Sequence, residues 1–307
     1  MMRILVTGGA GFIGSHTVDF LLEQELAVTV FDNFVSGRAD YLNLSHPNLT
    51  LVTGDVLDYS QLSAEIKKAD AVLHLAALPS VPKSIEDPVT SCAVNTQGFL
   101  HVLQAIRESK RAIRLVYASS AAVYGKVDTL PCRDDLPLLS EPLSPYALEK
   151  TNNERYADLY ARLFGIKSIG LRYFNVYGER QDPNSPYSGV ISKFIQCYQE
   201  NKPITIFGDG EQSRDFIYVK DVAKANWLAL QADYTGVLNI ATGVPETLQN
   251  LIRYIEQTGQ HPAKLQFEGA RLGDIPHSYA KTTEADFFLG FCYTTALQEG
   301  IRLLLLA

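Results

Sequence analysis

Short apolar runs alternate along this chain with longer segments in which apolar residues recur at helical spacing. The short runs cover residues 3–7, 27–31, 49–53, 71–75, 113–118 and 168–172. Continuous runs of this length, rich in β-branched residues, are typical of parallel strands that are buried on both faces. The segments at residues 12–22, 61–68, 88–109 and from 145 onward predict helices. The alternation predicts an α/β fold with a doubly wound parallel sheet.

This regular alternation weakens after residue 174. Residues 178–189 are polar and contain prolines, and shorter apolar segments follow them. No change in composition marks a linker, and the chain contains no internal repeat. We therefore expect a first domain over residues 1–174, to which later segments return, and a smaller lobe built mainly from residues 175–307.

The connection between the first strand and the first helix carries three regularly spaced glycines. Gly8, Gly11 and Gly14 form the pattern G-x-x-G-x-x-G, a relative of the dinucleotide-binding fingerprint. The glycines permit a sharp turn, a close approach to pyrophosphate and tight packing of the helix, whose N-terminus favours phosphate. Asp32 ends the second strand, where it can bind an adenosine ribose and would repel a 2′-phosphate. A glycine-rich turn without a nucleotide is the alternative, but this context favours NAD.

Composition and charge narrow the class of protein. The 307 residues carry a formal net charge of −7 and no run of Lys or Arg, which argues against nucleic acid or an anionic membrane as a partner. The four isolated cysteines lack metal-type spacing and are expected to be reduced thiols, so no metal site is predicted. The chain enters a strand at once, and its longest fully apolar run is residues 303–307, which we interpret as a buried or interface end of the last helix. We expect no signal peptide, no membrane span and a cytoplasmic location.

A second group of reactive side chains is expected where a strand end meets a helix. Ser119 and Ser120 end the strand that starts at residue 113, and Tyr146 and Lys150 lie four residues apart on one helical face. A nearby ammonium lowers the pKa of a phenol, which makes Tyr146 a usable acid and base. Lys150 can also hold the nicotinamide ribose, and a serine hydroxyl can orient the substrate. Y-x-x-x-K alone occurs by chance on surface helices, but its place after the glycine pattern favours a reactive site.

The motifs together resemble those of the extended short-chain dehydrogenase/reductase family, nearest to its UDP-glucose and UDP-N-acetylglucosamine 4-epimerases. The resemblance covers nearly the whole chain and implies a Rossmann-type sheet with NAD as cofactor. Its pieces are T-G-G-A-G-F-I-G at 7–14, G-D-V at 54–56, H-L-A-A at 74–77, S-S-A-A-V-Y-G at 119–125, S-P-Y-A-L-E-K at 144–150, L-R-Y-F-N-V-Y-G at 171–178 and R-D-F-I-Y-V-K-D at 214–221.

The resemblance also implies roles for individual residues. The catalytic set is Ser120, Tyr146 and Lys150. The residues implied to bind NAD are Gly8, Gly11, Phe12, Ile13, Gly14, Asp32, Asn33, Asp55, Val56, Leu75, Ala76, Ala77, Tyr146, Lys150 and Tyr173. The residues implied to bind the UDP-sugar are Ser80, Ser120, Tyr146, Asn175, Gln181, Gly189, Val190, Arg214, Arg271, Asp274 and Ser278. Arginine suits the diphosphate because its planar fork donates two hydrogen bonds and stays charged.

The residues after Ser120 discriminate among the reactions of the family, which all begin with hydride removal from the sugar C4. Family dehydratases carry an Asp-Glu pair there and decarboxylases a Glu, whereas this chain has Ala121 and Ala122. This absence favours epimerisation, in which the 4-keto sugar rotates and takes the hydride back on its other face. The alternatives are a UDP-glucose-only or uronate 4-epimerase, a net nucleotide-sugar oxidoreductase and a non-catalytic NAD-binding module. The intact Ser, Tyr and Lys set argues against the last of these.

One position late in the substrate lobe of such enzymes lies beside the C2 substituent of the sugar. A Tyr there excludes an N-acetyl group and Ser or Cys admits it, and Ser278 occupies this position here. Residues 180–189, with the small Gly189, also resemble epimerases of N-acetylated sugars. Pro79 and Ala121 stand where those enzymes often carry Gly and Ser. We expect interconversion of UDP-N-acetylglucosamine and UDP-N-acetylgalactosamine, with some activity on UDP-glucose and UDP-galactose.

Two helices are expected to form a homodimer interface, because in the family they pair across a two-fold axis. They cover residues 88–109 and 145–163, whose apolar content is broader than one stripe. The alternative is that these side chains serve the core of their own protomer. The residues in question are Phe99, Leu100, Val102, Leu103, Leu159, Leu163 and Phe164.

Overall fold

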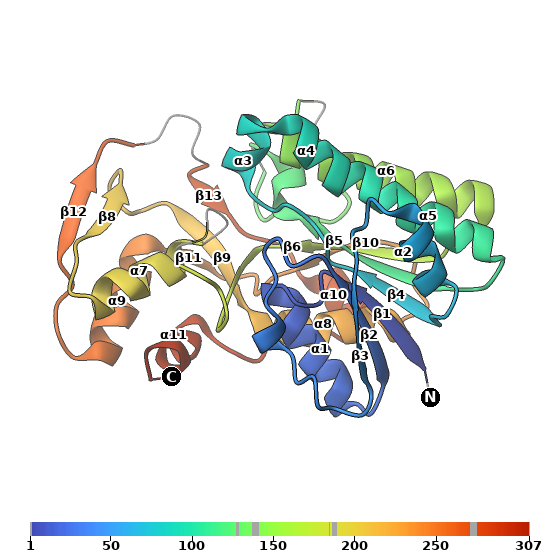
Figure 1. Ribbon diagram of the computed structural model, residues 1–307. Coiled ribbons are helices and arrows are strands. Elements are labelled where there is room, and N and C mark those ends of the chain that lie inside the picture. Colours follow the sequence, from blue (N-terminus) through green and yellow to red (C-terminus); the bar gives the residue numbers. More distant parts are fainter. Residues whose placement is uncertain are drawn as a thin grey trace.

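Seven parallel strands form the main sheet of the computed structural model, in the order β3-β2-β1-β4-β5-β6-β10 (Figure 1). The structure describes residues 2–126, 129–136, 141–183, 185, 189–270 and 275–306. The strands are β1 (Arg3–Thr7), β2 (Ala27–Asp32), β3 (Leu49–Thr53), β4 (Ala71–His74), β5 (Arg114–Ser120), β6 (Ser168–Tyr173) and β10 (Gly236–Ile240). The order reverses between β1 and β4, which in such sheets opens a crevice at the carboxyl ends of the strands. The predicted doubly wound sheet is confirmed.

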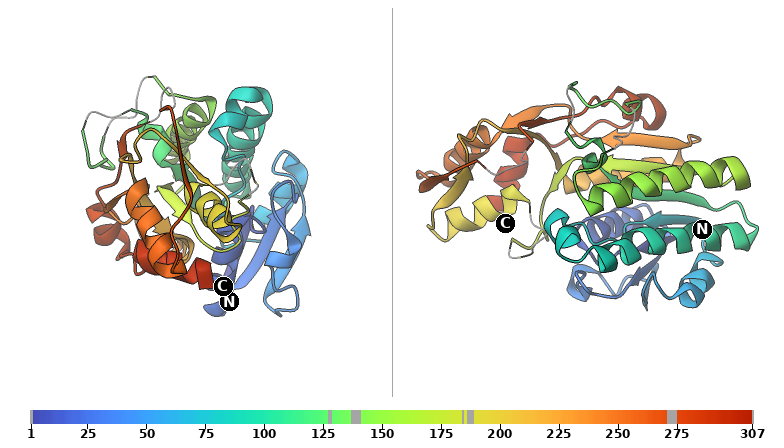
Figure 2. Two further views of the ribbon diagram at one scale, coloured as in Figure 1. Left: turned by 90° about the vertical axis from the view of Figure 1, so that its left-hand side faces the viewer. Right: turned by 90° about the horizontal axis from the view of Figure 1, so that it is seen from above.

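Helices cover both faces of this sheet, because alternate strand residues point to opposite sides. Ile4 and Val6 of β1 pack in one apolar layer, and Leu5 between them packs in the other. The first layer includes α1 (Phe12–Glu23), α8 (Val219–Gln231) and α10 (Thr283–Leu289). The second includes α2 (Tyr59–Ile66), α5 (Gly98–Ser109) and α6 (Pro145–Phe164). Figure 2 shows the long α6 lying beside α5.

Two predicted helices differ from those observed. α2 begins at Tyr59, two residues before the predicted start, because the Asp58 side chain caps it by accepting from Gln61 N at 3.1 Å. The single helix predicted over residues 88–109 is instead α4 (Pro88–Cys92), a π-helical turn η2 (Ala93–Gln97) and α5. Asn95 lies in this wider turn and bonds to residues outside the helix, so side-chain contacts stabilise a geometry that apolar periodicity does not signal.

A second lobe stands beside the carboxyl ends of the main sheet (Figure 1). Its sheet pairs β11 (Pro245–Thr247), β9 (Ser213–Tyr218) and β13 (His277–Ser278), and β7 (Asn175–Tyr177) also pairs with β9. The remaining elements of the lobe are β8 (Ile204–Phe207), β12 (Leu265–Glu268), α7 (Val190–Gln199), α9 (Leu248–Gly259) and α11 (Leu297–Leu306). The shorter helical segments elsewhere are η1 (Ala39–Tyr41), α3 (Val81–Glu86) and η3 (Ala121–Tyr124). A separate apolar cluster joins α7, α9 and α11 to β8 and β9.

The chain crosses between the two lobes more than once. After β7 has entered the second lobe, α8, β10 and α10 pack on the main sheet. The boundary at residue 174 stays a prediction. Leu303, Leu304 and Leu305 of α11 are half-buried against the core of the second lobe. All four cysteines are free, and among the described residues no helix is long and apolar enough to span a bilayer.

Candidate cofactor and catalytic site

The ends of β1, β2 and β4 border a cavity of about 470 Å³, a volume within the usual range for small-molecule and cofactor sites. Every residue that the sequence predicts to bind NAD lies in its lining. These residues are Gly8, Gly11, Phe12, Ile13, Gly14, Asp32, Asn33, Asp55, Val56, Leu75, Ala76, Ala77, Tyr146, Lys150 and Tyr173. Segments from five strand ends, those of β1, β2, β3, β4 and β6, and from α6 thus converge on one site.

Each of the three glycines is required for a different structural reason. Gly8 adopts φ +71°, and a Cβ on it would lie 2.6 Å from the backbone nitrogen of Ala76 at the end of β4. A Cβ on Gly14 would lie 2.1 Å from the Gly8 carbonyl oxygen, so helix and loop pack in direct contact. A Cβ on Gly11 would meet only that same oxygen, at 3.2 Å. Gly11 therefore leaves open space at the N-terminus of α1, where a diphosphate can approach the backbone.

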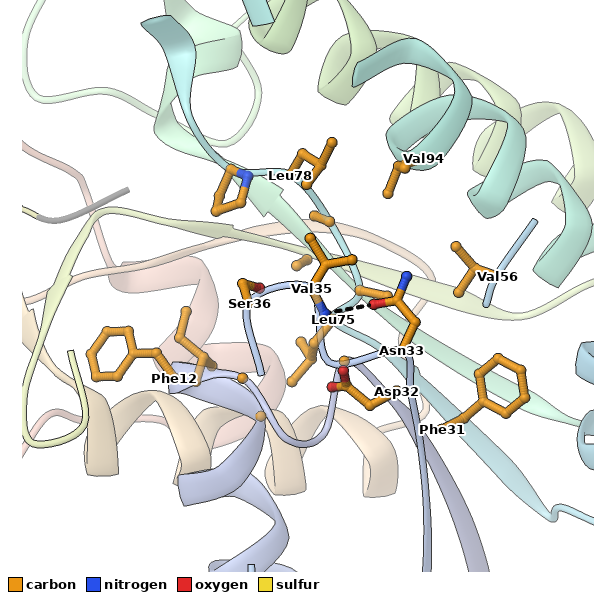
Figure 3. A pocket seen from close by; sticks show the side chains of 18 of the residues that line it. Phe12, Phe31, Asp32, Asn33, Val35, Ser36, Val56, Leu75, Leu78 and Val94 are labelled. Atoms are coloured by element: carbon orange, nitrogen blue, oxygen red, sulfur yellow. Dashed lines mark hydrogen bonds between the residues drawn. The ribbon is translucent and has the colours of Figure 1, made fainter. Parts of the chain in front are cut away.

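Asp32 connects the loop after β1 with the loop after β2. Its carboxylate accepts hydrogen bonds from Ala10 N at 2.9 Å and from Phe34 N at 2.8 Å, and the residue is buried. Each carboxylate oxygen retains acceptor capacity, and the residue lines the cavity. In Figure 3 Asp32 and Asn33 lie between the apolar side chains of Phe31, Val56 and Leu75. Asn33 donates to Asp55 at 3.0 Å, which joins the ends of β2 and β3.

This lining fits a dinucleotide on the observations above. The glycine loop and the α1 N-terminus suit a diphosphate, Asp32 suits ribose hydroxyls, and the apolar residues Val56 and Leu75 provide flat contact for rings. The buried carboxylate of Asp32 disfavours an additional phosphate at the ribose, because both would carry negative charge.

Local sequence places the catalytic helix beside β5. Ser144 caps α6 by accepting from Ala147 N at 3.1 Å, and Pro145 occupies the first turn, where it is tolerated. Tyr146 and Lys150 follow on one face, and both are buried. Tyr146 also donates its backbone N–H to the Ser84 hydroxyl of α3 at 3.1 Å. Ser120, at the end of β5, hydrogen-bonds the Tyr146 phenol, so the predicted catalytic trio is brought together.

The expected lowering of the Tyr146 pKa by Lys150 is not observed. Burial raises the pKa of Tyr146 to about 12, against a lowering by its hydrogen bond with Ser120. Lys150 donates instead to the Ala118 carbonyl oxygen at 2.9 Å, and its Nζ lies 5.7 Å from the centre of the Tyr146 ring. Burial also lowers the pKa of Lys150, to about 8. The sequence could not signal this outcome, because desolvation depends on the packing around α6.

The predicted substrate residues are distributed differently. Tyr146 and Gln181 line the cavity, and a Cβ on Gly189 would lie 3.5 Å from Gln181 Nε2. Ser278 of β13 is paired with Arg214 of β9 in the small sheet. Asn175 of the adjoining β7 donates to the Asp215 carbonyl oxygen at 3.2 Å. Arg271 and Asp274 lie outside the described residues.

Two other predicted substrate residues have evident structural contacts. Ser80 is buried and caps α3 by accepting from Lys83 N at 3.2 Å. Val190 packs against the apolar core of the second lobe. These contacts explain both residue types without a ligand, and the cavity lining includes neither residue.

Residues that the prediction missed close one side of the cavity. Arg38, Tyr41 and Arg180 line it, although only Arg180 fell within a segment noted in the sequence. Arg180 pairs with Asp19 of α1 at 2.8 Å, and His16 of α1 bonds to the carbonyl oxygen that precedes Arg180, at 2.9 Å. These bonds hold the segment after β7 against the helix that starts the nucleotide loop. No local sequence pattern predicts contacts between residues that lie so far apart in the chain.

The chain is similar to known proteins over nearly its whole length. A family model described as "NAD dependent epimerase/dehydratase family" matches residues 4–241. A Methanocaldococcus jannaschii protein named "Putative UDP-glucose 4-epimerase" is 40% identical over 302 residues, which cover 97% of this chain and 96% of that protein. UDP-N-acetylglucosamine 4-epimerase from Methanobrevibacter ruminantium M1, solved with UDP-N-acetylmuramic acid, has a TM-score of 0.93 and 39% identity, covering 99% of this chain and 98% of that one. The UDP-glucose 4-epimerase of Thermus thermophilus, solved with NAD, has a TM-score of 0.88 and 35% identity, covering 98% of this chain and 97% of that one.

The matches to individual proteins cover nearly the full length of this chain and of each relative, so they include the second lobe as well as the main sheet. They confirm the predicted enzyme family and the prediction of NAD as its cofactor. The names of the relatives differ in the sugar they state. The chain belongs to the NAD dependent epimerase/dehydratase family, among its nucleotide-sugar 4-epimerases.

Proposed function

We propose that this protein inverts C4 of UDP-hexoses, interconverting UDP-N-acetylglucosamine and UDP-N-acetylgalactosamine and also acting on the non-acetylated pair. The observation that carries the proposal is that Tyr146 and Lys150 line the same cavity as the glycine loop and Asp32. Ala121 and Ala122 follow Ser120, so this segment offers no acid for elimination. Oxidation at C4 followed by return of the hydride is the chemistry that these residues support.

The side chains have distinct parts in this reaction. NAD, when bound, accepts a hydride from the sugar C4 and returns it to the opposite face of the ring. Tyr146 takes the proton of the C4 hydroxyl and later gives it back, so no proton is gained or lost over a cycle. Ser120, which hydrogen-bonds the Tyr146 phenol, orients the C4 oxygen. Lys150 holds the nicotinamide ribose and keeps positive charge near Tyr146.

We infer the binding roles of the surrounding residues from the same geometry. The fifteen predicted residues that line the cavity bind NAD, and Asp32 among them binds the adenosine ribose. From the resemblance of the motifs, we infer that Arg214, Arg271, Asp274 and Asn175 bind the nucleotide diphosphate and sugar. Ser278 and Gly189 lie at the C2 substituent. The pairing of Ser278 with Arg214 supports placing the sugar and its diphosphate on the same face of the small sheet.

The experiment that tests this function follows both product and cofactor. Purified protein is incubated separately with UDP-N-acetylglucosamine and UDP-glucose, and the mixtures are separated by anion exchange while absorbance in the reduced-cofactor band is recorded. We expect the 4-epimer of each sugar, no requirement for added NAD and no lasting absorbance, because NAD is regenerated in every cycle. Stoichiometric accumulation of NADH with a keto product would instead identify a net oxidoreductase.

Substrate choice is tested at Ser278. Ser278→Tyr should reduce turnover of UDP-N-acetylglucosamine by roughly ten- to a hundredfold and spare UDP-glucose, because overpacking commonly costs about 1–3 kcal/mol. Tyrosine is well tolerated in strands, and Ser278 lies in β13. Ser278→Cys is the matched control and should keep both activities. Equal loss of both substrates in the Tyr variant would refute the assignment.

We propose a homodimer through α4 and α6, although part of the predicted interface proves to be core. Phe99, Val102 and Leu103 are fully buried within the protomer, because α5 packs on the main sheet. The exposed apolar side chains that remain for a partner lie on α4 and α6. They are Val89 (78% exposed), Leu148 (44%), Tyr156 (36%), Leu163 (61%) and Phe164 (42%). Light scattering at micromolar concentration should give twice the 34.0 kDa chain mass. Leu163→Glu should shift this mass toward the monomer, and a monomeric wild type would contradict the proposal.

A further inference from the structure

The catalytic helix carries a buried carboxylate immediately before Lys150. Glu149 is 3% exposed, and one carboxylate oxygen accepts from the Ser91 hydroxyl at 2.9 Å and from Asn95 Nδ2 at 2.7 Å. Its other oxygen, Oε1, is buried and has no hydrogen-bond partner. None of the ion pairs found among the described residues includes Glu149. A carboxylate in this state is costly to bury, so its contacts and charge call for an explanation.

The donors to Glu149 connect the catalytic helix to the wall of the cofactor cavity. Asn95, in the π-helical turn, donates to the Leu78 carbonyl oxygen at 3.0 Å and accepts from Leu78 N at 2.7 Å. Leu78 lines the cavity next to Ala77. Asn153, one turn beyond Glu149 on α6, donates to the Asn95 carbonyl oxygen at 2.9 Å. The hydrogen bonds therefore run from α6 through the turn between α4 and α5 to the cavity wall. Figure 1 shows α4 and α5 beside α6.

We propose that Glu149 is a positioning residue for Tyr146 and Lys150, whose buried carboxylate holds α6 against the π-helical turn and sets a fixed negative charge beside the pair. The proposal deepens the proposed function and rests on it for the roles of Tyr146 and Lys150. Glu149 touches neither cofactor nor sugar in this scheme and acts only through its neighbours. A π-helical turn is often found at a functional site, and here it supplies the donor that orients the carboxylate.

The charge of Glu149 acts in the same direction on both members of the pair. Burial lowers the pKa of Lys150, and the negative charges of Glu149 and Glu154 oppose that lowering. Burial raises the pKa of Tyr146, and Glu149 raises it further. Because a negative charge favours the protonated form of each neighbour, its removal lowers both pKa values. The entire pH–rate profile should then move to lower pH.

No other titratable group near the pair acts on both residues in this way, since Glu154 raises the pKa of Lys150 alone. Glu154 of α6 is held in a bidentate ion pair by Arg172 of β6. His74 of β4 stays neutral, because burial lowers its pKa to about 3. Tyr117 of β5 stays neutral as well, since burial raises its pKa. The remaining groups on the elements packed against α6 are Lys83 and Glu86 of α3, which pair with each other, exposed Cys92 of α4, His101, Arg107 and Glu108 of α5, Arg114 of β5, Tyr124 of η3 and Tyr173 of β6.

The test uses the NAD-loaded enzyme and Glu149→Gln, whose amide oxygen can accept the same two hydrogen bonds without the charge. We expect the pH–rate profile of 4-epimerisation to move down by roughly half to one pH unit. The Tyr146 phenolate, titrated by ultraviolet difference absorbance with Tyr146→Phe as baseline, should shift in the same direction. Ser91→Ala removes one hydrogen bond and keeps the charge, so both curves should stay at their wild-type pH. Glu149→Asp, which keeps the charge on a shorter side chain, should also keep the wild-type pH values while turnover falls.

The outcomes separate this inference from the proposed function. If Glu149→Gln leaves profile and titration in place, or lowers turnover equally at every pH, the inference is overturned. If Glu149→Gln does not fold, a shifted profile in Glu149→Asp overturns it, and an unshifted one supports it. If the wild type turns over no UDP-hexose while the phenolate titration still shifts in Glu149→Gln, the proposed function fails and the placement of the charge stands.

Discussion

Tyr146→Phe should abolish most of the turnover and leave the fold and the bound NAD in place. A positioned acid and base contributes on the order of 10² to 10⁴ in rate, so turnover is expected to fall by that factor. Phenylalanine keeps the buried ring and the backbone bond to Ser84, and it loses the hydrogen bond with Ser120. The measurement is the initial rate of 4-epimerisation at saturating UDP-sugar.

The matched control for this variant is Tyr124→Phe, which removes a buried phenol that lies outside the cavity lining. Tyr124 bonds to Asn239 at 2.7 Å and accepts from Arg172 at 2.8 Å, so its loss should affect stability more than turnover. NAD content after gel filtration and the circular dichroism spectrum show whether each variant is folded. A Tyr146→Phe enzyme that keeps more than about a tenth of wild-type turnover would exclude the proposed role.

Arg172→Met should destabilise the protein by about 3–5 kcal/mol, because it leaves the Glu154 carboxylate buried without its partner. Both side chains are almost fully buried, at 3% and 4% exposure, and Arg172 donates to both carboxylate oxygens, at 2.9 and 2.7 Å. Ser119 also donates to Glu154 at 2.5 Å, so the pair anchors the end of β5 next to Ser120. Unfolding in urea, followed by fluorescence, gives the change in free energy.

Two comparisons make this prediction specific. The double variant Arg172→Met with Glu154→Leu should recover much of the lost stability, because no uncompensated charge is left in the core. Arg302→Met removes an exposed partner of Glu299, at 51% and 47% exposure, and should change stability little. An Arg172→Met protein as stable as the wild type would show that the buried pair does not hold β6 to α6.

Six of the seven strands of the main sheet, β1 to β6, could be predicted because short apolar runs mark them, whereas β10 was not predicted. Residues 3–7 and 49–53 appear as β1 and β3 with the predicted bounds, since a continuous apolar run ends where the chain leaves the sheet. The small sheet of the second lobe was not predicted. β13 has two residues and β7 three, and their pairing with β9 depends on segments far apart in the chain.

The glycine loop, the acid at the end of β2 and the common face of Tyr146 and Lys150 follow from the sequence alone. These features depend on neighbouring residues, because strand ends, turn glycines and helical spacing are local. Tertiary structure decided the surroundings of these groups. Glu149 meets Ser91 and Asn95 only because α6 packs on the turn between α4 and α5. Burial likewise decided that the pKa of Tyr146 is raised and not lowered. Desolvation and hydrogen bonds arise from elements that only the folded chain brings together.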